Sequence, residues 1–72
     1  MSDNVKKALL MAMTATNDSG YNAVQQMVGY LATGDETYLP KVAREYINLY
    51  SVDEYLNALV EEFWANNKPV QE

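Results

Sequence analysis

Apolar residues along this chain recur at steps of three and four positions, which is the spacing of one face of an α-helix. The first such stripe begins after Ser2 and Asp3, two residue types suited to cap a helix N-terminus. Leu10 and Met11 lie beside the stripe, so they either widen its buried face or contact a partner subunit. Gly20 can adopt the left-handed conformation that ends a helix. The stripe consists of Val5, Ala8, Leu9, Ala12 and Met13.

The stretch from Gly20 to Pro40 contains all three glycines, and it predicts a short central helix onto which the longer helices pack. Asn22 is its expected N-cap, and Gly34 is the expected residue just past its C-terminus. Gly29 lies within the helix, where glycine costs about 1 kcal/mol relative to alanine. It either permits the close approach of another backbone or is merely tolerated. The predicted buried face consists of Val24, Met27, Val28 and Leu31.

A third helix is predicted to start at Pro40, because proline is favoured at the first helical position and interrupts a helix that runs through it. Asp35 can cap the short turn over residues 36–38, where an acidic residue suits the positive end of a helix. The predicted buried stripe is Val42, Ala43, Tyr46, Ile47 and Tyr50, with Leu49 beside it. The residues predicted to face water are Lys41, Arg44, Glu45 and Asn48.

Ser51-Val52-Asp53-Glu54 begins the fourth helix and fits the capping box, in which the Ser and Glu side chains satisfy each other's backbone amides. An apolar stripe follows, and Trp64 is its last residue. The polar residues 66–68 and Pro69 are predicted to end the helix. No window alternates like a strand. The predicted buried residues of this helix are Val52, Tyr55, Leu56, Leu59, Val60 and Phe63.

These segments predict an all-α fold, a small bundle of four helices, in a single domain over residues 1–72 with frayed ends at about 1–3 and 67–72. A domain of 72 residues has a small core and usually needs an additional stabilising element. The chain has no cysteine and no histidine, so a disulfide is excluded and a structural zinc site is disfavoured. Oligomerisation remains as the additional stabilising element. It is favoured because 49% of the residues are hydrophobic, which is more apolar surface than one small protomer obviously needs. We therefore expect a homodimer.

The net charge of −5 argues against binding to nucleic acid, which requires clustered lysine and arginine. We expect no membrane span, because no apolar run has the necessary length. The apolar run after Lys6 and Lys7 is too short and too interrupted for a secretory signal, and the absence of cysteine is compatible with a cytoplasmic protein.

Nothing in the sequence predicts catalysis, a cofactor or a metal. Without histidine and cysteine, the catalytic arrangements that depend on them cannot form within one chain. The acidic pairs Asp53-Glu54 and Glu61-Glu62 are better explained by a capping box and a solvated helix face. Gly29, Gly34 and Lys41 do not have the spacing of a phosphate-binding loop. We therefore expect a protein that is not an enzyme.

Six tyrosines, one phenylalanine and one tryptophan are a large aromatic content for this length. Such side chains form cores and dimer interfaces, or a surface that binds another protein. Two alternatives remain: a small enzyme or ligand-binding domain with a tyrosine-lined pocket, and an accessory protein of a phage or mobile element. The residues predicted to form the interface are Leu10, Met11, Met13, Tyr46, Tyr50 and Trp64.

The central stretch resembles the motif of the IreB family of small regulatory phosphoproteins, which occurs mainly in Gram-positive bacteria. The similarity covers most of the chain and continues more weakly through Asp53-Glu54, Leu59-Val60 and Phe63-Trp64. The matching residues of the motif are Gly20, Tyr21, Asn22, Gln26, Val28, Gly29, Tyr30, Leu31, Gly34, Asp35 and Tyr38.

The resemblance implies an all-helical cytoplasmic homodimer without catalytic activity, acting downstream of a transmembrane Ser/Thr kinase and its phosphatase in cell-envelope stress signalling. Family members usually have proline where this chain has Ala23 and Glu36, and a longer, more basic third helix. Their regulatory threonines precede the first helix. The corresponding stretch here offers Ser2 alone, so no phosphorylation site is transferred.

Overall fold

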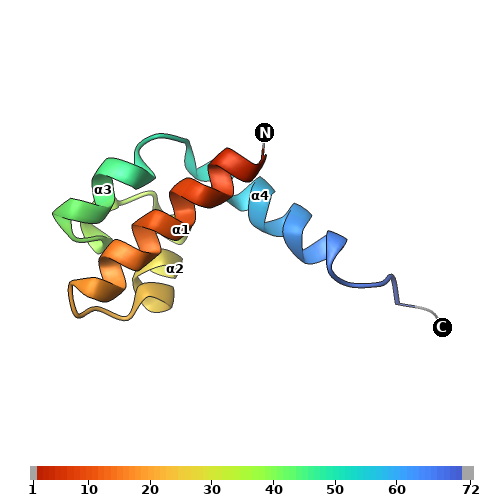
Figure 1. The fold of residues 1–72 in the computed structure, drawn as a ribbon, viewed down its shortest axis with the longest axis horizontal. Helices are drawn as coiled ribbons and strands as arrows, with labels where there is room; N and C mark the ends of the chain where they lie inside the picture. Colours follow the sequence, from red (N-terminus) through yellow and green to blue (C-terminus); the bar gives the residue numbers. More distant parts are fainter. Residues whose placement is uncertain (1, 71–72) are drawn as a thin grey trace.

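The computed structural model describes residues 2–70, and within them it confirms the predicted all-α class (Figure 1). Residues 2–70 contain no strand. Both chain ends were expected to fray, and residues 1, 71 and 72 lie outside the described residues. At the N-terminal end, α1 already includes Ser2. At the C-terminal end, residues 67–70 follow the last helix. The elements are α1 (Ser2–Asp18), α2 (Ala23–Thr33), the 3₁₀ turn η1 (Glu36–Tyr38), α3 (Lys41–Ile47) and α4 (Val52–Ala65).

The helix at the centre of the fold is α1, which packs against α3, α4 and α2. The expectation that the helix after Gly20 is central was wrong, because α2 packs mainly on η1 and on one part of α1. The stripe predicted for α1 is confirmed, with Val5, Ala8, Leu9 and Ala12 buried and Met13 packed against the core. A buried stripe this long gives α1 enough surface to contact three other helices.

Several core residues lie outside the predicted stripes. Thr16 is fully buried, and its hydroxyl donates to the carbonyl of Ala12 at 2.8 Å, which satisfies the polar group inside the helix. Leu39 is also buried, although it lies in the connection between η1 and α3. Helical periodicity cannot select a residue outside a helix, so Leu39 was not predicted.

The predicted buried face of α2 was partly wrong. Met27 is buried as expected, whereas Val24 and Val28 are exposed and Tyr30 takes their place in the core. The helix carries two neighbouring apolar stripes, and both have helical spacing. The packing of η1 and α1 against one of them decides which is buried, and that information is not local to the helix.

The third helix is shorter than predicted, since it ends at Ile47 and Pro40 is its N-cap rather than its first residue. Ala43 and Ile47 are buried as expected, but Val42 and Leu49 are exposed. Arg44, which was predicted to face water, is only partly exposed. Its Nε donates to the carbonyl of Leu39 at 3.0 Å, which ties α3 to the connection that precedes it.

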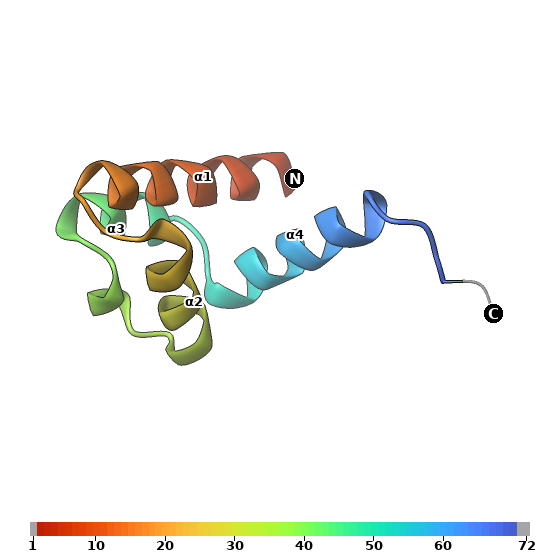
Figure 2. The ribbon, with the colours of Figure 1, turned by 90° about the horizontal axis from the view of Figure 1, so that it is seen from below.

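The capping box that begins α4 is confirmed, with Ser51 and Glu54 bonded to each other's backbone amides. Beyond its first turns, α4 extends away from the other helices, as Figures 1 and 2 show from two directions. The protomer is accordingly elongated, at 45 × 23 × 21 Å. Because of this geometry, Tyr55 and Ala58 are buried, whereas most of the predicted stripe is exposed: Leu56, Leu59, Val60 and Phe63.

Candidate protein-interaction surface

Most residues of the Gly20–Tyr38 motif build a local scaffold. Gly20 and Gly34 have φ angles of 90° and 75°, a region that disfavours side chains with a Cβ. Asn22 caps α2 by accepting a hydrogen bond from the amide of Gln25 at 3.0 Å. Asp35 caps η1 by accepting from the amide of Thr37 at 3.0 Å and from its hydroxyl at 2.6 Å. These hydrogen bonds hold the pKa of Asp35 below its usual value.

Gly29 allows an aromatic ring, rather than another backbone, to approach α2 closely. A Cβ added at Gly29 would lie 3.0 Å from Cγ of Tyr38 and closer still to the edge of its ring. Gln26 reinforces this contact, because its Nε2 donates to the carbonyl of Tyr38 at 2.7 Å. The motif therefore fixes η1 on α2 through one small residue and one side-chain hydrogen bond.

Tyr21 and Val28 belong to the motif but have no visible role in this scaffold, since both side chains are exposed. Val24 is exposed one helical turn before Val28. Tyr30, by contrast, is a core residue, and burial raises the pKa of its hydroxyl, with a further contribution from Glu36. The scaffold thus leaves part of α2 available to contact another molecule.

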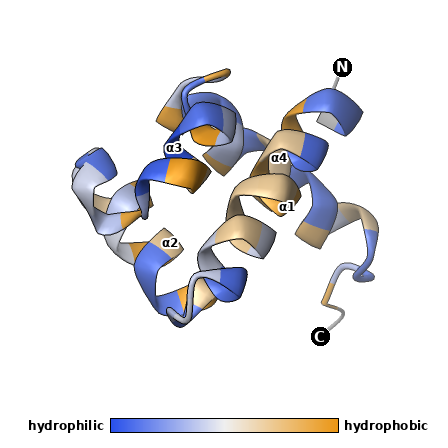
Figure 3. Ribbon diagram, turned by 60° about the vertical axis from the view of Figure 1, so that its left-hand side comes forward, coloured by the Kyte–Doolittle hydropathy of each residue, from blue (hydrophilic) through white to orange (hydrophobic). Residues whose placement is uncertain are grey.

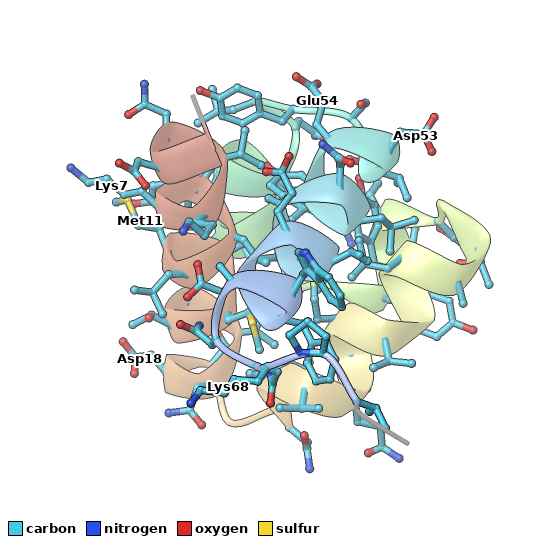
Figure 4. The ribbon with its side chains drawn as sticks, turned by 90° about the vertical axis from the view of Figure 1, so that its right-hand side faces the viewer. Lys7, Met11, Asp18, Asp53, Glu54 and Lys68 are labelled. Carbon is cyan, nitrogen blue, oxygen red and sulfur yellow. The ribbon has the colours of Figure 1, made fainter. Side chains whose placement is uncertain are left out.

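An open groove of about 530 Å³ lies between α1 and α3. Three of the six predicted interface residues, Leu10, Met11 and Tyr46, meet there. Figure 4 shows Lys7, Met11 and Asp18 along the outer side of α1, and Figure 3 shows hydrophobic segments on both helices. The groove, which we call the α1–α3 groove, is lined by Leu10, Met11, Thr14, Ala15, Asp18, Ser19, Val42 and Tyr46.

The other three predicted interface residues lie elsewhere. Met13 packs against the core. Tyr50 lines a separate cleft of about 420 Å³ between the start of α1 and α4. Its ring also meets the buried ring of Tyr55 edge-on, with the centroids 6.1 Å apart. Trp64 lies near the end of α4 and is exposed. The predicted set therefore does not form one continuous surface within the protomer.

A second apolar surface follows α4, and the sequence interpretation had assigned most of it to the core. No local signal in the sequence could have revealed it, because the stripe is exposed through the direction in which α4 extends beyond the other helices (Figure 2). We call this surface the α4 stripe. It consists of Leu56, Leu59, Val60, Phe63 and Trp64, all exposed.

The polar contacts of α4 attach it to the rest of the fold. Lys6 on α1 forms an ion pair with Glu62, and this contact raises the pKa of Lys6 and lowers that of Glu62. The hydroxyl of Tyr55 donates to the carbonyl of Ile47 at 2.8 Å. Burial raises the pKa of Tyr55 to about 12. These groups therefore hold α1, α3 and α4 together.

The six tyrosines do not converge on a single pocket. Tyr46 and Tyr50 lie in separate cavities, Tyr30 and Tyr55 are in the core, Tyr38 covers Gly29, and Tyr21 is exposed in the turn before α2. The alternative of one tyrosine-lined pocket therefore gains no support. Across residues 2–70, no three acidic side chains are grouped as ligands for a metal ion. Among the described helices, none combines the length and the apolar character required to cross a bilayer.

The family model described as "IreB regulatory phosphoprotein" matches residues 1–65. The match includes the whole α2–η1 scaffold, the α1–α3 groove and the α4 stripe.

Proposed function

The chain belongs to the IreB family of regulatory phosphoproteins, and from this premise we propose that it is a non-catalytic regulator that acts by binding another protein. The observation that supports this proposal is the amount of apolar side chain left on the protomer surface, in the α1–α3 groove and on the α4 stripe. Apolar surfaces of this extent are typical of sites of protein association.

The α1–α3 groove is the proposed binding site for the regulated protein. Leu10, Met11 and Tyr46 provide an aliphatic, a flexible thioether and an aromatic contact, which suit the apolar face of an amphipathic helix. Lys7 and Asp18 lie toward the two ends of α1 (Figure 4). An apolar centre with charged residues at its edges is the usual composition of an interface.

We further propose that the protein works in the cytoplasm, downstream of a transmembrane Ser/Thr kinase and its phosphatase in cell-envelope stress signalling. Thr14 and Ser19 line the groove, and their hydroxyls donate to the carbonyls of Leu10 and Ala15. A phosphate on either hydroxyl would introduce negative charge into the apolar contact and oppose binding. This gives the kinase a physical route to the proposed site.

The test is affinity capture from the native host with the wild-type chain and with Met11→Glu as baits. Met11→Glu places a charge in the groove, so a protein retained by the wild type should be lost. Leu49→Glu is the matched control, because Leu49 is exposed outside the groove and its replacement should retain the same protein. Equal retention by all three baits would contradict the groove as the binding site, and retention of no protein by the wild type would contradict the proposed function.

We also propose that the protomer pairs with a second copy of itself. The domain is small and stripes with core-like spacing remain exposed on α2 and α4, so association would bury surface that the protomer alone cannot.

A further inference from the structure

We infer that the α4 stripe is the self-association surface, and that it packs against the α4 stripe of a second copy with the two helices antiparallel. This inference rests on the homodimer of the proposed function and specifies which surface forms it. It leaves the α1–α3 groove free for the regulated protein.

The exposed area of the stripe is large enough to contribute to a stable interface. Phe63 and Trp64 are 68% and 64% exposed. Aromatic side chains bury 150–250 Å² each, so these two alone offer on the order of 250 Å². A standard-size interface buries roughly 800 Å² per partner, and two aromatic residues therefore provide about a third of it. Leu56, Leu59 and Val60 extend the same stripe along α4.

The spacing of the stripe suits a two-fold axis. Positions 56, 59, 60 and 63 are symmetric about the midpoint between Leu59 and Val60. An antiparallel pair centred there places Leu56 opposite Phe63 of the partner subunit and Leu59 opposite Val60 of the partner subunit. The same patch is then used on both copies, as a two-fold interface requires.

The charges on α4 favour the antiparallel orientation over the parallel one. Its first turn is acidic, with Asp53 and Glu54, and Lys68 follows its C-terminus (Figure 4). Lys68 is the one basic residue of the sequence after Arg44. In the antiparallel pair, Lys68 of each copy reaches the acidic turn of the other. A parallel pair would instead bring the two acidic first turns together, which is unfavourable because like charges repel.

The way in which α4 is held presents this stripe outward. Tyr55 and Ala58 face the core, and Glu62 is paired with Lys6 on α1. The stripe lies on the adjoining side of the helix, where α4 extends beyond the other helices (Figure 2). A second helix can therefore approach α4 along its exposed length without displacing a contact within the protomer.

The experiment measures the dimer dissociation constant of the purified full chain by analytical ultracentrifugation. Phe63→Ala should raise it at least about 50-fold, because each dimer loses two large aromatic contacts. Met11→Ala, in the groove, is the control and should leave it within about twofold of the wild type. Helix content by circular dichroism identifies any variant that fails to fold.

Charge reversal tests the orientation. Asp53→Lys and Lys68→Glu should each raise the dissociation constant about threefold to tenfold at low salt, because two exposed pairs are lost per dimer. The double variant restores both pairs with reversed sign and should return to within about twofold of the wild type. Asp53 is chosen because Glu54 belongs to the capping box.

A dimer that is insensitive to Phe63→Ala, or one that Met11→Ala disrupts, would overturn the assignment of the surface. Charge reversals that fail to compensate each other would overturn the antiparallel pairing. A wild-type chain that stays monomeric would overturn both the inference and the homodimer. Binding of another protein is judged separately by the capture experiment with Met11→Glu, so the two failures are distinguishable.

Discussion

Replacing Tyr55 with phenylalanine tests how α3 and α4 are joined. The ring of Tyr55 is fully buried, and its hydroxyl donates to the carbonyl of Ile47 at 2.8 Å and lies 3.2 Å from the carbonyl of Tyr46. These carbonyls belong to the last turn of α3, which has no following helical turn to satisfy them. The carbonyl of Tyr46 also accepts from the amide of Leu49, so the loss in Tyr55→Phe falls mainly on Ile47.

The expected cost follows from this hydrogen bond. Phenylalanine preserves the buried ring, so the packing contribution is nearly unchanged. Leaving a buried acceptor unsatisfied costs about 1–3 kcal/mol, and we expect Tyr55→Phe to lower the free energy of unfolding by about 1–2 kcal/mol. For a domain of this size, each kcal/mol lowers the melting temperature by about 4–8 °C.

The difference between the two chains should also depend on pH. The pKa of Tyr55 is raised from 10.0 to about 12, so the folded chain holds this proton more tightly than the unfolded chain. The stabilising contribution of the hydroxyl is therefore complete below pH 10 and is lost as the pH rises toward 12. The stability difference between the wild type and Tyr55→Phe should shrink over this interval.

The assay is urea unfolding followed by circular dichroism, at a fixed protomer concentration because association would shift the midpoint. Tyr21→Phe is the control, since Tyr21 is exposed and its replacement should leave the midpoint nearly unchanged. If Tyr55→Phe unfolds at the wild-type midpoint, or if its difference from the wild type grows above pH 10, the reasoning about this hydrogen bond is refuted.

Three further predictions concern α2, α4 and assembly. Gly29→Ala should destabilise the wild type, despite the better helix propensity of alanine, because the added Cβ meets the ring of Tyr38. In a Tyr38→Ala chain the same substitution should raise the free energy of unfolding by up to about 1 kcal/mol, as measured by denaturant unfolding. A change in the free energy of unfolding with the same sign in both backgrounds would exclude the contact with the ring. Ser51→Ala should lower the free energy of unfolding by about 0.5–2 kcal/mol, and an unchanged urea midpoint would argue against a stabilising role for the capping box. Light scattering at micromolar concentration should give twice the protomer mass of 8.1 kDa, and the single protomer mass would be evidence against self-association.

The residues that were predicted correctly are those whose structure is set by near neighbours. Asn22, Gly34 and Asp35 act as caps or helix ends as expected, and Ser51 pairs with Glu54 in its capping box. Each of these depends on residues two to four positions away, so the sequence contains the information. The same holds for the buried stripe of α1, whose periodicity is uninterrupted from Val5 to Met13.

The residues that were missed depend on tertiary packing. On α2, the choice between Val24 with Val28 and Met27 with Tyr30 is made by η1 and α1, which lie elsewhere in the chain. On α4, the stripe has core-like spacing, but α4 extends away from the other helices and leaves the stripe exposed. The periodicity of apolar residues predicts an apolar helix face. It does not indicate whether an element of the same chain or another molecule covers that face. The α1–α3 groove was predicted only in part, through Leu10, Met11 and Tyr46.

The central claim, that a second copy covers the α4 stripe, is tested most directly by oxidative cross-linking of Val60→Cys. The chain contains no natural cysteine, so any disulfide must join the two introduced thiols. Position 60 lies beside the proposed two-fold axis, and the account predicts rapid formation of a covalent dimer under mild oxidation, with Met11→Cys in the groove remaining uncross-linked. A Val60→Cys chain that stays monomeric on denaturing gels, or a Met11→Cys chain that cross-links equally fast, would contradict the claim.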